Sequence, residues 1–109
     1  EVRRIVGLVT FRVLPGMDKE QSKAVYYENI RRDKKASVVK VIDRCNNVST
    51  MAGPFSKEKI INYVLETEKY VMPLFDVIKN NFPEYADLSF IVKYHVISVL
   101  ETAKLLVTQ

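Results

Sequence analysis

The sequence predicts an all-α protein, a bundle of about five helices that forms one domain over residues 1–109. A chain of 109 residues suits a single small domain. Hydrophobic residues make up 48% of it and recur at spacings of three and four, which is typical of amphipathic helices around a core. Only 3 Gly and 4 Pro are present, fewer than a β-sandwich or barrel with many tight turns needs.

The first predicted helix covers residues 2–13, although its β-branched residues leave a strand as the alternative. Pro15–Gly16 breaks this segment. Asp18 is then the expected N-cap of a second helix that runs to about Arg32. The apolar residues that carry the helical spacing in the first segment are Val2, Ile5, Val6, Val9 and Val13.

The third predicted helix covers about residues 35–51 and ends before a Gly-Pro pair. Ser56 begins a fourth helix over residues 57–81, in which Pro73 predicts a kink or break. The last helix covers about residues 84–107. Its expected apolar stripe consists of Ile91, Tyr94, Ile97, Leu100 and Leu105.

Net charge, apolar runs and cysteine count limit the partners and the cellular compartment that we expect for this chain. A net charge of +4 is modest, so nucleic acid is not an expected partner. The basic run Arg31–Lys35 fits a helix end, where cations are favoured, with phosphate contact as the alternative. The chain has no apolar run long enough to span a bilayer and no signal peptide. A lone Cys45 excludes an internal disulfide and fits a reducing compartment, so we expect a cytoplasmic protein without a membrane partner.

The polar face of the third helix is the candidate site. Asp43 lies opposite the apolar face, Asn47 follows one turn later, and Thr50 continues the row. Asparagine is a poor helix former, so Asn46 and Asn47 reduce helix propensity where Lys or Glu would not. A solvated surface is one interpretation of this row. The other is a metal ligand followed by contacts to a sugar or base.

A complete catalytic site is not evident. A catalytic metal usually takes three or more protein ligands, and the chain has a single His95 and a single Cys45, far apart in sequence. Cys45 points toward the apolar side, where burial makes a thiol inert. Glu66 and Glu68 are expected on a solvated face. No glycine-rich phosphate loop is present.

Residues 38–51, VVKVIDRCNNVSTM, resemble the Leu-Ile-Lys-Leu-Ala-Asp-Arg-Leu-His-Asn-Met-x-Thr-Leu segment of RelA/SpoT-type proteins, which carry an HD-superfamily phosphohydrolase domain. The family often has His where this chain has Asn46. Three further segments are similar to the family's pattern: EVRRIVGLVT at residues 1–10, YYENIRRD at 26–33 and ETEKYVMPL at 66–74. The likeness covers roughly residues 1–75.

The resemblance implies a metal-dependent hydrolase of guanosine tetraphosphate and pentaphosphate, in a family whose bifunctional members are also GTP pyrophosphokinases of the stringent response. Asp43 would be the last ligand of a His…His-Asp…Asp set that holds manganese or another divalent metal. Asn47 and Thr50 would contact the guanine nucleotide. Arg44 would either bind or orient the nucleotide, or have a structural role.

The family's other metal ligands precede the segment that matches Val2, so the resemblance implies the C-terminal part of an HD domain. We therefore expect that this chain alone neither binds manganese tightly nor hydrolyses the nucleotide. Helices left bare by absent partners favour association, which makes a homodimer a reasonable expectation. A non-catalytic helical binding or regulatory module is the alternative function.

Overall fold

The computed structural model describes residues 1–50 and 55–108, and this part of the chain is helical, with no strand. The predicted all-α class with about five helices is confirmed. The α-helices of the described part are α1 (Val2–Leu8), α2 (Lys19–Arg31), α3 (Lys34–Thr50), α4 (Lys57–Glu66), α5 (Met72–Asn81) and α6 (Ala86–Val107). A π-helical segment, η1 (Thr67–Val71), joins α4 to α5, and a 3-10 turn, η2 (Pro83–Tyr85), precedes α6.

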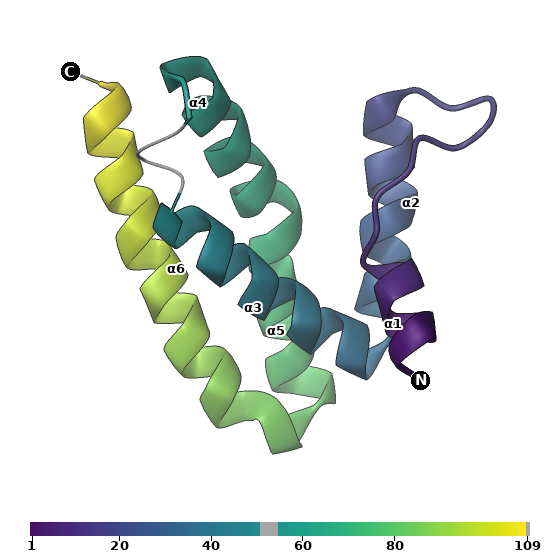
Figure 1. Cartoon of the computed structure of the whole chain (residues 1–109). Coiled ribbons are helices and arrows are strands. Elements are labelled where there is room, and N and C mark those ends of the chain that lie inside the picture. Colours follow the sequence, from purple (N-terminus) through teal and green to yellow (C-terminus); the bar gives the residue numbers. More distant parts are fainter. Residues whose placement is uncertain (51–54, 109) are drawn as a thin grey trace.

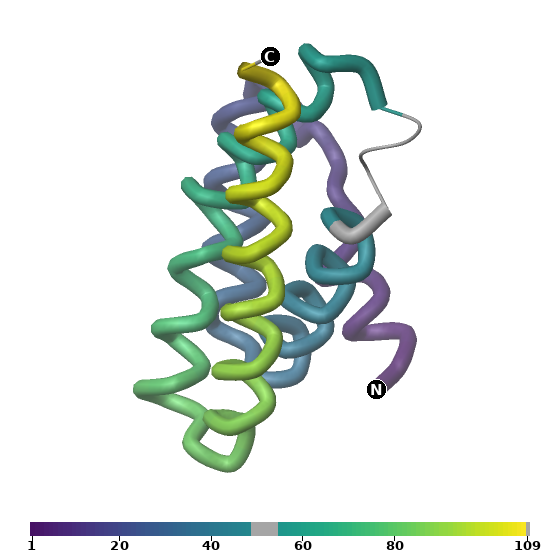
Figure 2. Tube along the Cα trace, turned by 90° about the vertical axis from the view of Figure 1, so that its left-hand side faces the viewer, coloured from purple at the N-terminus to yellow at the C-terminus, as the bar shows by residue number. Residues whose placement is uncertain are grey.

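The long helical hairpin at the C-terminal side organises the bundle. The rod formed by α4, η1 and α5 runs beside α6, and η2 joins the two at one end (Figures 1 and 2). α3 crosses the face of this hairpin and packs against both α5 and α6. α1 and α2 pack against α3 and against each other, so α3 is the element that holds the two parts together.

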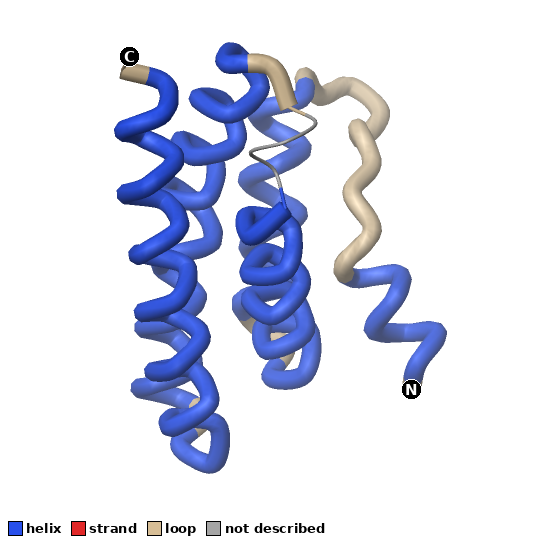
Figure 3. Tube along the Cα trace, turned by 60° about the vertical axis from the view of Figure 1, so that its left-hand side comes forward, coloured by secondary structure: helices blue, strands red, loops and turns tan. Residues whose placement is uncertain are grey.

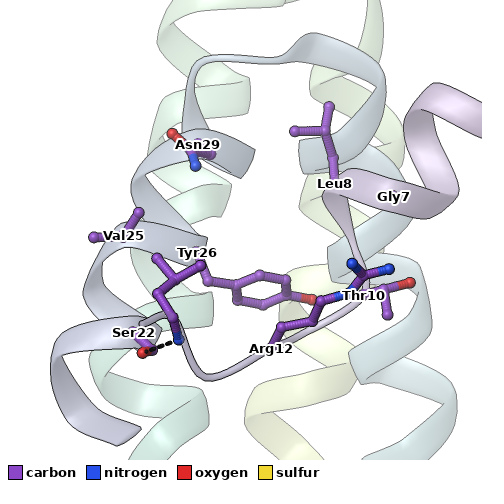
Figure 4. Close-up of a pocket in the computed structure, with 9 residues that line it drawn as sticks. Gly7, Leu8, Thr10, Arg12, Ser22, Val25, Tyr26 and Asn29 are labelled. Atoms are coloured by element: carbon purple, nitrogen blue, oxygen red, sulfur yellow. Dashed lines mark hydrogen bonds between the residues drawn. The ribbon is translucent and has the colours of Figure 1, made fainter. Parts of the chain in front are cut away.

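The first helix ends at Leu8 rather than near Val13, because side chains of α2 hold the following segment in a loop (Figure 3). The Tyr26 hydroxyl donates to the Val9 carbonyl at 2.5 Å. The buried Ser22 hydroxyl accepts from the Leu14 backbone N–H at 2.9 Å, the dashed bond in Figure 4. Asp18 then caps α2 as predicted, in a reciprocal capping box with Gln21.

Pro73 disturbs the fourth predicted helix as expected, but the irregularity lies just before it. Proline has no N–H to donate, so regular α-helical bonding is lost at this point. The chain widens into η1, where the Met72 N–H bonds to the Thr67 carbonyl five residues back. The result is a single rod with a bulge rather than two separate helices.

The core lies where α3 meets the hairpin. Its fully buried larger side chains come from α2, α3, η1, α5 and α6: Ile30, Val41, Val48, Val71, Leu74, Phe75, Ile78 and Val96. The predicted stripe of the last helix is wrong in part, because Ile91, Tyr94 and Leu105 are exposed and Ile97 is half-buried. The buried face of α6 is Ser89, Val96, Leu100 and Ala103. Apolar residues surround this helix on several sides, so spacing alone selects no unique face.

An apolar groove of about 470 Å³ lies between α1, the first half of α3 and η2. Its walls include Val2, Val6 and Val39, each of which is exposed. Exposed apolar surfaces of this kind often pack against another protein, but no observation tests the expected homodimer, which stays a prediction. None of the described helices combines the length and hydrophobicity that crossing a lipid bilayer requires.

Candidate functional site

The exposed face of α3 carries a carboxylate and an amide one turn apart. Asp43 and Asn47 are both exposed, and the Asn47 amide donates to an Asp43 carboxylate oxygen at 3.3 Å. Val41 and Val48 lie in the core on the other side, as the helical spacing predicts. The α3 backbone reaches Thr50, but the side chain of Thr50 lies outside the described residues.

Arg44, directly after Asp43, points inward and is only 4% exposed. One guanidinium nitrogen donates to a Glu66 carboxylate oxygen at 2.7 Å and to the Tyr27 hydroxyl at 3.0 Å. The other terminal nitrogen donates to the Thr67 hydroxyl at 3.3 Å, and the guanidinium carbon lies 4.2 Å from the centre of the Tyr63 ring. Arg44 thereby fixes α3 against α2, α4 and η1.

Glu66 is the carboxylate at the centre of this arrangement, with a side chain that is 22% exposed. Its second oxygen accepts from the Lys23 ammonium at 2.6 Å. Burial alone would raise the pKa of Glu66, but hydrogen bonds from Lys23 and Arg44 outweigh burial and lower that pKa to about 2. Glu66 therefore stays ionised at any physiological pH.

Lys40 supplies another buried cation, since it is only 8% exposed. Its ammonium lies 5.3 Å from the centre of the Tyr26 ring and 5.6 Å from that of Tyr27, within cation–π range. Burial lowers the pKa of Lys40. Tyr27 in turn stacks on Tyr70 with ring centres 4.8 Å apart. We call Tyr27, Lys40, Arg44 and Glu66 the Arg44 cluster.

Glu66 makes the stability of the fold depend on acid pH. Its folded-state pKa of about 2 lies below the ordinary 4.5, so its stabilising contribution is complete above pH 4.5 and is lost as pH falls through 2. After allowance for partial exposure, we expect the wild type to lose about 2 kcal/mol more than Glu66→Gln between pH 5 and 2. Urea unfolding of both proteins between pH 5 and 2 measures this difference in the free energy of unfolding. Glu58→Gln, which alters an exposed carboxylate, should show the same dependence of unfolding free energy on pH as the wild type. If wild type and Glu66→Gln lost the same free energy of unfolding between pH 5 and 2, Glu66 would not be the source of the pH dependence.

The basic run Arg31–Lys35 is largely engaged in surface ion pairs. Arg31 and Arg32 each lie 3.3 Å from Glu28, and Lys35 lies 3.1 Å from Glu1. Lys34 pairs with Glu84. Arg31 lies in the last turn of α2, where the helix-end interpretation places a cation, and phosphate contact stays an untested alternative.

A complete metal centre is not formed by the part of the chain that the structure describes, where no three His, Cys, Asp or Glu side chains gather. His95 is exposed on α6. Cys45 is half-buried, and burial raises the pKa of its thiol, as an unreactive cysteine requires. Asp43 can offer a single carboxylate group to a metal, whereas a catalytic metal usually takes three or more protein ligands.

Sequence reasoning missed Lys23, Lys40 and Glu66, and its placement of Glu66 on a solvated face is wrong. A signal was present: Arg44 lies one turn from both Val41 and Val48, whose burial the spacing predicts. A buried guanidinium needs an acidic partner. The sequence did not show that Glu66 is the acid that pairs with Arg44. The π-helical turn that follows Glu66 has no clear sequence signature.

Comparison with known proteins adds no relative: no protein-family model, curated protein or solved structure matches the chain.

Proposed function

We propose that this chain forms part of an HD-type metal-dependent phosphohydrolase that acts on a phosphorylated guanine nucleotide of the guanosine tetraphosphate class. The observation that supports this proposal best is the Asp43–Asn47 pair, which lies exposed on α3 with 3.3 Å between amide nitrogen and carboxylate oxygen. A carboxylate beside an amide offers both an oxygen for a hard cation and a donor for a nucleoside.

The proposal gives each residue a distinct part. Asp43 would contribute one metal ligand, and Asn47 and Thr50 would contact the nucleoside. Arg44 is enclosed by Tyr27, Glu66 and Thr67, so we assign it the part of positioning α3 rather than touching the nucleotide. The other metal ligands would come from outside the residues described, and no catalytic step is assigned to these residues alone.

The test begins with the coding DNA upstream of the Glu1 codon. We expect a reading frame that adds about 70–90 residues, estimated from ordinary helix and domain sizes, with a His and a His-Asp pair. The product of that full frame should hydrolyse guanosine tetraphosphate with manganese, and Asp43→Asn should reduce hydrolysis to background. Asp76→Asn, which neutralises an exposed carboxylate elsewhere, is the matched control.

Two outcomes would contradict the proposal. One is an upstream sequence that lacks the His and His-Asp pair. The other is an Asp43→Asn protein that hydrolyses the nucleotide at the wild-type rate. Either result would favour the alternative of a helical binding module without catalysis.

A further inference from the structure

A cleft separates α2 from the rod of α4 and η1, and neither Asp43 nor Asn47 is among the residues that line it. Two hollows of about 450 and 310 Å³ make it up. They share Lys19, Lys23, Asn62 and Glu66 in their walls, so they form one continuous depression. Hollows of this size fall in the range that holds small organic ligands.

The cleft carries an excess of positive charge. Lysines enter it from both sides, with Lys19 and Lys23 on α2, Lys59 on α4 and Lys69 on η1. The acids in its walls are Glu20 and Glu66. Glu66 already binds Lys23 and Arg44, and Glu20 lies 3.8 Å from Lys69, so little negative charge remains uncompensated.

Two of these lysines are available to an incoming anion. Among the described residues, neither Lys19 nor Lys59 has a carboxylate within ion-pair distance. The Lys59 ammonium instead lies 5.7 Å from the centre of the Phe55 ring. An anion placed between α2 and α4 would meet both ammonium groups, and lysine serves well as a point charge for phosphate.

Aromatic and amide groups accompany this charge. Phe55 and Tyr63 line the smaller hollow, with ring centres 5.7 Å apart in an edge-to-face pair. Tyr70 lines the larger hollow. Asn62 presents an amide that can both donate to and accept from the edge of a base.

We infer that the α2–α4 cleft binds a mononucleotide through its phosphates, with Lys19 and Lys59 on the phosphate groups and Phe55 against the base. The small, local depression favours a mononucleotide over a nucleic-acid strand, which would need an extended basic stripe. This inference does not depend on the proposed metal-dependent hydrolysis, because Asp43 takes no part in it.

The test uses the 109-residue chain with adenosine triphosphate as the probe, without metal, by calorimetry at low salt. We expect Lys19→Gln/Lys59→Gln to raise the dissociation constant by about tenfold or more, since two direct phosphate contacts are removed. Lys79→Gln/Lys93→Gln removes the same charge from a hollow between α5 and α6. This control should change the dissociation constant for adenosine triphosphate by less than about twofold. Backbone amide shifts should move in α2 and α4.

A second variant tests the ring. Phe55→Ala should weaken binding of adenosine triphosphate while leaving binding of inorganic pyrophosphate unchanged, because only the base contacts the ring. Three results would overturn the inference: no binding by the wild type, equal weakening by both lysine pairs, or a single-stranded oligonucleotide that binds more tightly than adenosine triphosphate. The last result would identify the cleft as part of a nucleic-acid surface.

Discussion

Replacing Arg44 by alanine is expected to lower the free energy of unfolding by about 3 kcal/mol, the lower end of the range for breaking a buried ion pair. The lower end applies because Glu66 is 22% exposed and keeps its bond to Lys23 after Arg44 is removed. The Tyr27 hydroxyl also loses its guanidinium donor. Chemical denaturation of the purified chain, followed by circular dichroism at neutral pH, measures the loss.

Two further variants separate the causes of this loss. In a Glu66→Gln background, Arg44→Ala should lower the free energy of unfolding by about 1–2 kcal/mol less, because the Arg44–Glu66 ion pair is already absent. Arg31→Ala removes an exposed arginine whose partner is Glu28, and should change the free energy of unfolding by less than about 0.5 kcal/mol. Equal losses for Arg44→Ala and Arg31→Ala would show that the Arg44 cluster does not hold α3 in place.

The fold was largely predictable because its helices are bounded by local signals. Asp18 and Ser56 cap α2 and α4 as their side-chain chemistry predicts. The errors arose where tertiary contacts override local preference. Val9 continues the helical spacing of α1, yet the chain leaves the helix there because Tyr26 satisfies its carbonyl. Such a contact joins residues far apart in sequence, so spacing cannot reveal it.

The candidate site was predictable on α3 alone. Asp43 and Asn47 share a face because residues four apart on a helix always do. The partners of Arg44 come from α2, α4 and η1, and their meeting depends on how these elements pack. Lys40 shows the same limit: its charge suggests an exposed side chain, whereas Tyr26 and Tyr27 enclose it.

Phe75→Ala should produce the largest loss of stability, about 4 kcal/mol in the free energy of unfolding. Phe75 is 1% exposed on α5 and belongs to the core where α3 meets the α5–α6 hairpin. Truncation removes the transfer free energy of the ring and leaves a cavity that the surrounding helices fill only in part. Urea unfolding at neutral pH measures the change.

Phe90→Ala is the matched control, because it deletes the same ring from a position on α6 that is 63% exposed. Phe90 still contacts Tyr94, with ring centres 4.7 Å apart. Its truncation should therefore lower the free energy of unfolding, but by less than about 1 kcal/mol. The contrast isolates burial as the cause, since both substitutions remove identical atoms. If Phe90→Ala destabilised the chain as much as Phe75→Ala, the exposed face of α6 would have to be covered in solution, and the homodimer expected from the sequence would be the first explanation to test by light scattering.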